Sequence, residues 1–117
     1  MFARVLLACM LAVSALNAQS SDDQAVEYAR RVVSGQNPVV PAAGYVPDSN
    51  TAIAIATAVL TPIYGKDKID AEKPWKAGLK GGVWTVTGTF NGKGNGGEAI
   101  VQIDKKTGTI VFVTHTM

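Results

Sequence analysis

The sequence predicts an α+β domain in which one core helix packs on a strongly curved antiparallel sheet of three to four strands. In residues 82–115, three runs of alternating apolar and small polar residues are separated by glycine-marked turns, which is typical of half-buried strands. The alanine-rich segment Ser49 to Tyr64 is apolar around most of its circumference, as expected of a buried helix. Gly88 lies inside the first run, where a glycine often marks a bend of the strand.

The first run has two chemically different faces. Trp84, Val86 and Phe90 share an apolar face with Gly88. The opposite face carries Val83, Thr85, Thr87 and Thr89. We expect the apolar face to contact the core helix and the threonine face to meet solvent or a partner.

Three further segments complete the predicted sheet. Residues 98–103 and 109–114 form the second and third strands, joined by a short hairpin in which Gly108 takes a positive φ. Residues 75–80 form a fourth strand whose lysines suit a sheet edge, because charge discourages pairing with another chain. The loop of residues 91–97 has four glycines and is expected to be mobile.

Two helices are predicted before the sheet. The core helix begins at Asp48 or Ser49 as the N-cap and ends at Gly65, and Pro62 tightens its last turn. An additional helix is predicted from Asp22 to Ser34, where it would cover an opening of the sheet. Residues 66–74 are interpreted as a charged connector.

The chain is predicted to divide into three parts. Residues 1–20 have the positive start, the apolar stretch and the small residues of a signal peptide, cleaved after Ala18 or Ser20. A lipoprotein reading at Cys9 is disfavoured, because it would leave the apolar residues after Cys9 exposed. Residues 21–46 form the first helix and a proline-rich linker, and residues 47–117 form the α+β domain. The expected location is therefore the periplasm, without stable membrane insertion after cleavage.

Composition limits the classes of partner. Loss of Arg4 with the signal would leave ten Lys and Arg against nine Asp and Glu, and the lysines are scattered among acids. This pattern argues against a nucleic-acid partner, which usually requires a basic stripe. No cysteine remains after cleavage, so packing must stabilise the domain without a disulfide.

Few residues could perform chemistry. His115 is the sole histidine, and the acids between residues 67 and 72 lack the spacing of a calcium loop, so neither a metal site nor a cofactor is expected. The glycines of residues 92–97 precede a strand, whereas phosphate-binding loops precede a helix. With no base paired to a nucleophile, the sequence predicts a protein that is not an enzyme.

Binding to another protein is the remaining interpretation. Tyrosine and tryptophan are enriched at interfaces, so Tyr64 and Trp75 are candidate contact residues, whereas Trp84 is assigned to the core. Thr85 and Thr87 represent the polar sheet face. His115 is either a solvated terminal histidine or a contact residue.

Several short motifs make residues 47–115 resemble immunity proteins with a nuclear transport factor 2-like fold. The motifs are Pro47-Asp48 before an alanine-rich helix that ends in Pro62-Ile63-Tyr64-Gly65, then Lys73-Pro74-Trp75-Lys76-Ala77, Trp84-Thr85-Val86-Thr87-Gly88-Thr89, Gly96-Gly97 and the hairpin from Ile103 to Ile110. The resemblance implies a cone-shaped, cystatin-like α+β fold and the binding of a cognate protein toxin from a polymorphic toxin system. It brings no catalytic residues. The signal peptide and the helix from Asp22 to Ser34 depart from the family pattern and imply action in the periplasm.

The sequence therefore favours a non-enzymatic periplasmic protein that neutralises a cell-envelope toxin by direct contact. Two alternatives stay open at this point. One is a regulatory or inhibitory module that acts on a peptidase, a sensor or another envelope protein. The other is a small-ligand binder or an enzyme, which would need a cavity lined by His115 and an acid.

Overall fold

The computed structural model describes residues 20–92 and 96–117. The predicted signal peptide, apart from its last residue, and the middle of the predicted glycine-rich loop lie outside the described residues. The chain forms two compact units, Met1–Val39 and Val40–Met117, each of which is considered by itself.

The described part of the first unit, residues 20–39, consists of the predicted additional helix and the first residues of the linker. The helix spans residues 20–34, and the side chains of Val26, Tyr28 and Val33 on it are exposed. The proposed covering role of this helix stays a prediction. Among the described residues, no helix combines the length and the apolar character needed to cross a membrane.

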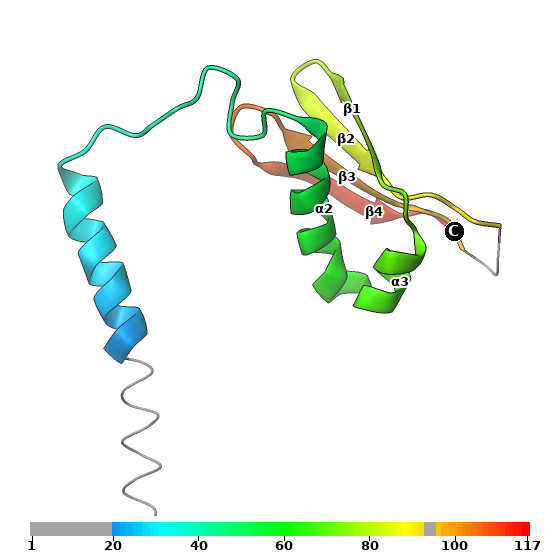
Figure 1. Ribbon diagram of the computed structural model, residues 1–117, viewed down its shortest axis with the longest axis horizontal. Helices are drawn as coiled ribbons and strands as arrows, with labels where there is room; N and C mark the ends of the chain where they lie inside the picture. The colour runs from blue at the N-terminus through cyan, green and yellow to red at the C-terminus, as the bar shows by residue number, and fades with distance from the viewer. Residues whose placement is uncertain (1–19, 93–95) are drawn as a thin grey trace, which may run out of the picture. The chain divides into compact units, whose positions relative to one another are not determined.

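The second unit contains two helices and a four-stranded antiparallel sheet (Figure 1). The elements in chain order are α2 (Ser49–Tyr64), α3 (Lys66–Ala71), β1 (Lys76–Lys80), β2 (Val83–Thr87), β3 (Ala99–Asp104) and β4 (Ile110–His115). Each strand pairs with the next one along the chain, so the spatial order is β1-β2-β3-β4. The predicted α+β architecture, with a curved antiparallel sheet, is confirmed.

The core helix α2 has the predicted caps. The Asp48 carboxylate accepts a hydrogen bond from the Thr51 amide at 2.8 Å, and Gly65 ends the helix with a φ of 94°. Pro62 lies in the last turn, where it removes the amide donor for the Ala58 carbonyl. One stripe of α2, formed by Ala52, Ala56 and Leu60, is fully buried.

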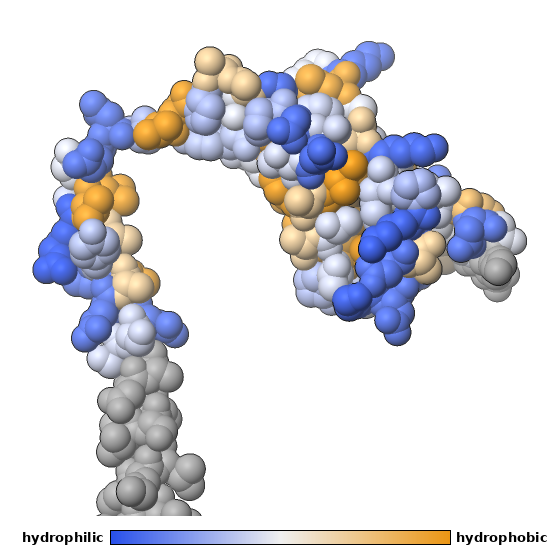
Figure 2. All heavy atoms as spheres, viewed as in Figure 1, coloured by the Kyte–Doolittle hydropathy of each residue, from blue (hydrophilic) through white to orange (hydrophobic). Residues whose placement is uncertain are grey.

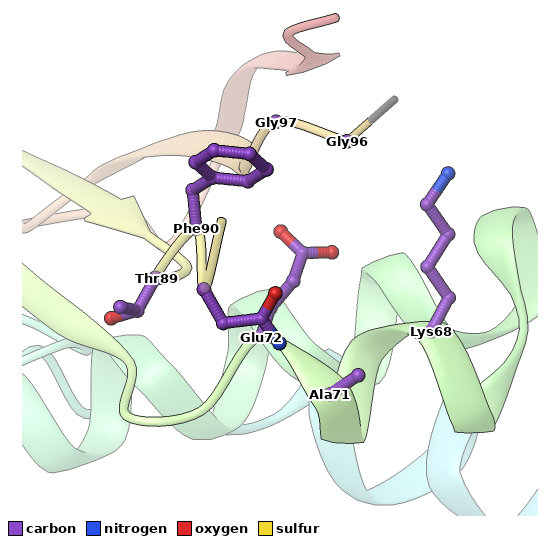
Figure 3. Close-up of a pocket in the computed structure, with 8 residues that line it drawn as sticks. Lys68, Ala71, Glu72, Thr89, Phe90, Gly96 and Gly97 are labelled. Atoms are coloured by element: carbon purple, nitrogen blue, oxygen red, sulfur yellow. The ribbon is translucent and has the colours of Figure 1, made fainter. Parts of the chain in front are cut away.

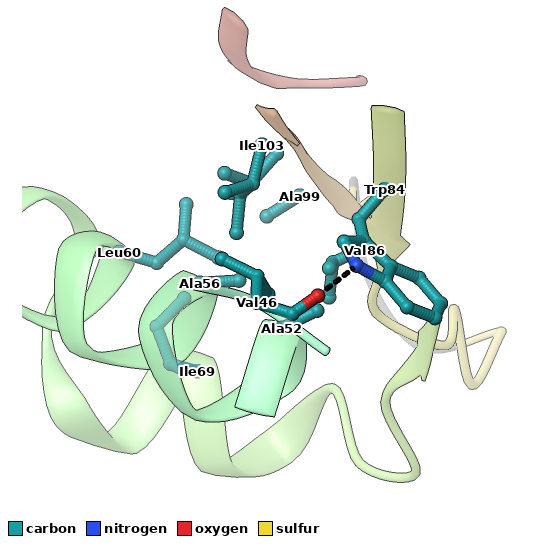
Figure 4. Packing of buried hydrophobic residues seen from close by; sticks show 10 residues of the cluster. Val46, Ala52, Ala56, Leu60, Ile69, Trp84, Val86, Ala99 and Ile103 are labelled. Carbon is teal, nitrogen blue, oxygen red and sulfur yellow. Dashed lines mark hydrogen bonds between the residues drawn. The ribbon is translucent and has the colours of Figure 1, made fainter. Parts of the chain in front are cut away.

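The core lies between α2 and one face of the sheet (Figure 4). The sheet contributes Trp84 and Val86 from β2 and Ala99, Val101 and Ile103 from β3. These buried residues alternate with partly exposed residues of the opposite face, so the predicted two-residue period determines which face of the sheet meets the core. The assignment of Trp84 to the core is confirmed, because only 8% of its surface is exposed.

Val46 belongs to this core although the sequence places it in the linker. Its side chain is fully buried, and its carbonyl oxygen accepts a hydrogen bond from Trp84 Nε1 at 2.8 Å (Figure 4). Its amide donates to the carbonyl of Lys105 in the β3–β4 turn. The end of the proline-rich segment is therefore held on the sheet, which its proline content does not indicate.

The prediction that residues 66–74 form a simple connector is wrong. Lys66–Ala71 forms the short helix α3, which buries Ile69 and carries an ion pair between Lys66 and Asp70 one turn apart. Most of its remaining side chains are polar, and hydrophilic residues cover α3 in Figure 2. A helix of this length is stabilised by packing more than by its own propensity, so its sequence pattern is weak.

Phe90 also departs from its predicted position on the apolar face. β2 ends at Thr87, and beyond it the Thr89 amide donates to the carbonyl of Glu72 at 2.7 Å rather than to β3. The chain thus leaves the sheet after Gly88, and 47% of the Phe90 surface is exposed.

The prediction of a hairpin between β3 and β4 is confirmed, because Gly108 has a φ of 75° and Asp104 accepts hydrogen bonds from the turn amides of Lys106 and Thr107.

Candidate functional site

Glu72 is the buried charged residue among the described side chains, with 6% of its surface exposed. It follows the last residue of α3, and its amide donates to the Ile69 carbonyl at 3.2 Å. Glu72 therefore lies where α3 ends beside the sheet, and its carboxylate points toward the strands. A buried carboxylate is costly unless it is fully hydrogen-bonded, so its partners define the site.

The Glu72 carboxylate joins two strands. Oε1 accepts a hydrogen bond from the Ala99 amide of β3 at 2.6 Å, and Oε2 lies 3.3 Å from Nε2 of His115 in β4. The Glu72 carbonyl accepts the Thr89 amide beyond the end of β2. One residue therefore links α3 to the neighbouring ends of three strands.

The contacts of the His115 ring determine which of its nitrogen atoms carries a hydrogen. Nδ1 is 2.7 Å from the carbonyl oxygen of Thr116, and because a carbonyl only accepts, Nδ1 carries a hydrogen. The contact between Nε2 and Glu72 Oε2 then needs one further proton, either on the ring or on the carboxyl group. Glu72 and His115 thus form a pair that is joined by this proton. The expectation of a solvated His115 is wrong, because its side chain is 10% exposed.

Tyr64 and Lys68 border this pair. The ring centroid of Tyr64, the last residue of α2, lies 5.2 Å from that of His115 with a tilt of 53°. Lys68 Nζ lies 5.9 Å from the Tyr64 centroid, within the range of a cation–π contact. The Tyr64 ring thus contacts both the His115 ring and the Lys68 ammonium group.

An open hollow of about 280 Å³ lies beside Glu72 (Figure 3). Its described lining comes from α3, from the residues after β2 and from those before β3, and comprises Lys68, Ala71, Glu72, Thr89, Phe90, Asn91, Gly96 and Gly97. Figure 3 shows the Glu72 carboxylate rising into this space between Phe90 and Lys68. The volume is at the lower limit for ligand pockets and suits one side chain or a small molecule.

The predicted contact residues do not form one surface. Tyr64 and His115 contact each other beside Glu72, and these three residues form the Glu72 cluster. Thr85 and Thr87 lie instead on the sheet face opposite α2. Thr85 Oγ1 accepts a hydrogen bond from Gln102 of β3 at 3.2 Å. A shared role in binding for all five predicted residues stays a prediction.

Trp75 is half-buried against the core instead of being exposed. Its Nε1 atom is buried and has no hydrogen-bond partner within residues 20–92 and 96–117. The side chain lines a second hollow, of about 390 Å³, between α2 and α3. Trp75 thus packs partly on the core, and its role as a contact residue stays a prediction.

Sequence reasoning missed Glu72 and the hollow. Glu72 is one of three acids in a lysine-rich segment, and no hydrophobic period distinguishes it from its exposed neighbours. Its location depends on Gly88, where a Cβ atom would lie 2.7 Å from Glu72 Oε1. Within the described residues, no group of three or more His, Cys, Asp or Glu side chains could hold a metal ion.

The comparisons with known proteins give one family match. Residues 51–117 match the family described as NTF2 fold immunity protein. Neither the curated proteins nor the solved structures give a match. The match includes most of α2 and all of α3, the four strands and the Glu72 cluster, which supports a toxin-neutralising role in general and suggests a non-enzymatic one. By its sequence over more than half its length and by its α+β architecture, the chain belongs to the NTF2 fold immunity protein family.

Proposed function

We propose that this protein is a periplasmic immunity protein that neutralises a cell-envelope toxin by direct contact, without catalysing a reaction. The observation that carries the proposal is the family match over residues 51–117. The periplasmic location is supported by the signal-peptide pattern of residues 1–20.

The hollow beside Glu72 is the surface that we assign to toxin binding. It combines a recessed polar floor with a half-exposed aromatic ring, Phe90, and a lysine at its rim. Concave sites of this kind accept an anchoring side chain of a partner, and aromatic residues beside them contribute strongly to binding. The Glu72 cluster holds the floor in place through three backbone-linked strands.

A protection assay tests the function. Cells that lack the gene should be killed by toxin-bearing kin, and expression of the full-length gene should restore survival. Undiminished survival of the deletion strain would contradict the toxin-neutralising role in these cells. Cell fractionation, with mass spectrometry of the mature N-terminus, tests the location and distinguishes cleavage after Ala18 from cleavage after Ser20.

A pair of variants tests the surface. Phe90→Ala removes the exposed ring at the hollow, and we expect toxin binding to weaken by about 30-fold, in the range of an interface hot spot. Thr85→Glu changes the opposite sheet face and should leave binding unchanged. If Thr85→Glu weakened toxin binding and Phe90→Ala did not, binding would be assigned to the threonine face. Thermal unfolding of both variants verifies that they remain folded.

One observation favours a second candidate, a small-ligand binder. The hollow places the Lys68 ammonium beside the half-exposed Phe90 ring, and small carboxylates with an apolar tail would suit it. A thermal-shift series with alkyl carboxylates would detect this function as a saturable stabilisation that Lys68→Gln reduces. Absence of any shift at millimolar carboxylate would exclude it.

A further inference from the structure

The two edges of the sheet differ in their protection against pairing. The first edge strand, β1, is short and carries Lys76, Gly78 and Lys80, all exposed. The other edge strand, β4, has no charged Lys, Arg, Asp or Glu from Ile110 to Thr114, and no proline. Native proteins usually protect edges with lysine, proline or a covering element, so β4 lacks the usual safeguards.

β4 is also little covered by α2 and α3. Within Val40–Met117, α2 adjoins β1, β2 and β3, whereas the backbone of β4 adjoins β3, and the His115 ring at the end of β4 contacts Tyr64 of α2. The side chains of Ile110, Val111 and Phe112 are 38%, 54% and 52% exposed. An apolar strand with these exposures is an unfavourable surface for an isolated molecule.

The register identifies which backbone groups point outward. The Thr116 amide donates to the Glu98 carbonyl, and β3 and β4 are antiparallel, so Thr114 and Phe112 also exchange hydrogen bonds with β3. The alternate residues Val113 and His115 therefore direct their amide and carbonyl groups away from the sheet. β4 thus offers a row of donors and acceptors to a further strand.

We propose that β4 pairs with β4 of a second copy of this chain, antiparallel and centred on Val113, to form a continuous eight-stranded sheet. In this register Val113 lies opposite its own symmetry mate and Val111 lies opposite His115. Phe112 lies opposite Thr114 on the face away from α2, in a non-hydrogen-bonded pair where side chains are closest. Aromatic and β-branched residues form favourable cross-strand pairs.

Charge favours self-pairing of β4 over self-pairing of β1. Self-pairing of β4 places no acidic or lysine side chains opposite each other, whereas self-pairing of β1 about Gly78 would place Lys76 opposite Lys80. Like charges directly opposite each other are destabilising. Because β1 resists pairing, the assembly closes as a two-fold dimer instead of extending into a filament.

Charged substitutions test the pairing on the full chain by sedimentation equilibrium across protein concentration. The native protein should form a dimer. Phe112→Lys combined with Thr114→Lys places two like-charge pairs across the interface and should raise the dimer dissociation constant by about tenfold or more. The double variant Phe112→Glu with Thr114→Glu should weaken its own dimer in the same way. A mixture of the lysine and the glutamate double variants should form a heterodimer. Lys76→Glu with Lys80→Glu is the control and should leave the dimer unchanged.

Amide hydrogen exchange gives a second readout that does not need substitutions. The Val113 amide should become protected as the concentration rises through the dimer range, whereas the Thr114 amide, bonded to β3, should be protected throughout. A monomer at all concentrations would overturn the proposal. So would a dimer that the β4 charges do not affect, concentration-independent exchange at Val113, or open-ended aggregation.

Discussion

At the scale of single residues, Gly88 provides the space that the Glu72 cluster needs. Its φ is not in the left-handed region, so its role is steric rather than conformational. An added Cβ would lie 2.7 Å from Glu72 Oε1, 2.9 Å from Glu72 Cβ and 3.1 Å from Trp75 Cη2. The buried carboxylate and a side chain at position 88 cannot share this volume.

Gly88→Ala should therefore destabilise the protein by about 1–3 kcal/mol, the usual range for overpacking a close-packed site. The measurement is urea unfolding followed by tryptophan fluorescence. Gly78→Ala is the matched control, because a Cβ there meets nothing within 4 Å, and its stability should stay near that of the native protein. Equal stabilities of the two variants would show that the site relaxes without cost.

Glu72 itself can be tested with an isosteric pair. Glu72→Gln keeps an oxygen for the Ala99 amide and supplies an amide donor to Nε2 of a neutral His115 that holds its proton on Nδ1. Glu72→Ala leaves the Ala99 amide without its acceptor, at a cost of about 1–3 kcal/mol. We expect thermal unfolding to rank the native protein and Glu72→Gln together, above Glu72→Ala. A Glu72→Gln variant as unstable as Glu72→Ala would show that an ionised carboxylate is required.

The cluster could not be predicted because its chemistry depends on tertiary neighbours. His115 and Tyr64 are candidate contact residues by residue type, but their contact joins the ends of α2 and β4, which are far apart in the sequence. The acid that completes the group follows a helix end, where no periodic pattern applies. Residue type identified candidates, and only the folded backbone brought them together.

At the scale of elements, the strands were predictable and α3 was not. β2 and β3 each bury one face, so burial alternates along them with the period that the sequence shows. β4 is exposed on much of its length, yet its β-branched residues still indicate a strand. α3 buries Ile69 alone, which leaves too few apolar positions to establish a helical period.

The segment before α2 is fastened to the sheet by the hydrogen bond between Trp84 Nε1 and the Val46 carbonyl. Trp84→Phe keeps a large aromatic ring but leaves the buried Val46 carbonyl without this donor, so stability should fall by about 1–3 kcal/mol. Trp75→Phe is the matched variant, because the buried Nε1 of Trp75 has no partner among the described residues. Loss of the Trp75 Nε1 atom should therefore lower the stability much less. Denaturant midpoints for the two variants provide the measurement, and a reversed order would contradict the argument.

At the scale of the whole molecule, acid stability should reflect three carboxylates that act in different elements. Hydrogen bonds from the backbone and side chain of Thr51 lower the pKa of Asp48 at the start of α2, below its ordinary value of 3.8. The hydrogen bond from Lys66 lowers the pKa of Asp70 in α3. The backbone and side chain of Thr107 lower the pKa of Asp104 in the β3–β4 hairpin. Protonation of any of these three carboxylates should therefore lower the free energy of unfolding.

Because these folded-state pKa values lie below 3.8, the unfolded chain binds more protons than the folded one in that range. The stabilisation from these groups is fully present above the unfolded value and is lost as the pH falls through the folded values. The free energy of unfolding should therefore decrease as the pH falls below about 4, measured by urea titrations between pH 6 and pH 2. Asp104→Asn preserves an acceptor for the Thr107 amide but removes the charge, so its stability should depend less steeply on pH in this window. Thr85→Ala changes no ionisable group and should keep the native slope. An Asp104→Asn slope equal to the native one would show that the hairpin carboxylate does not couple folding to pH.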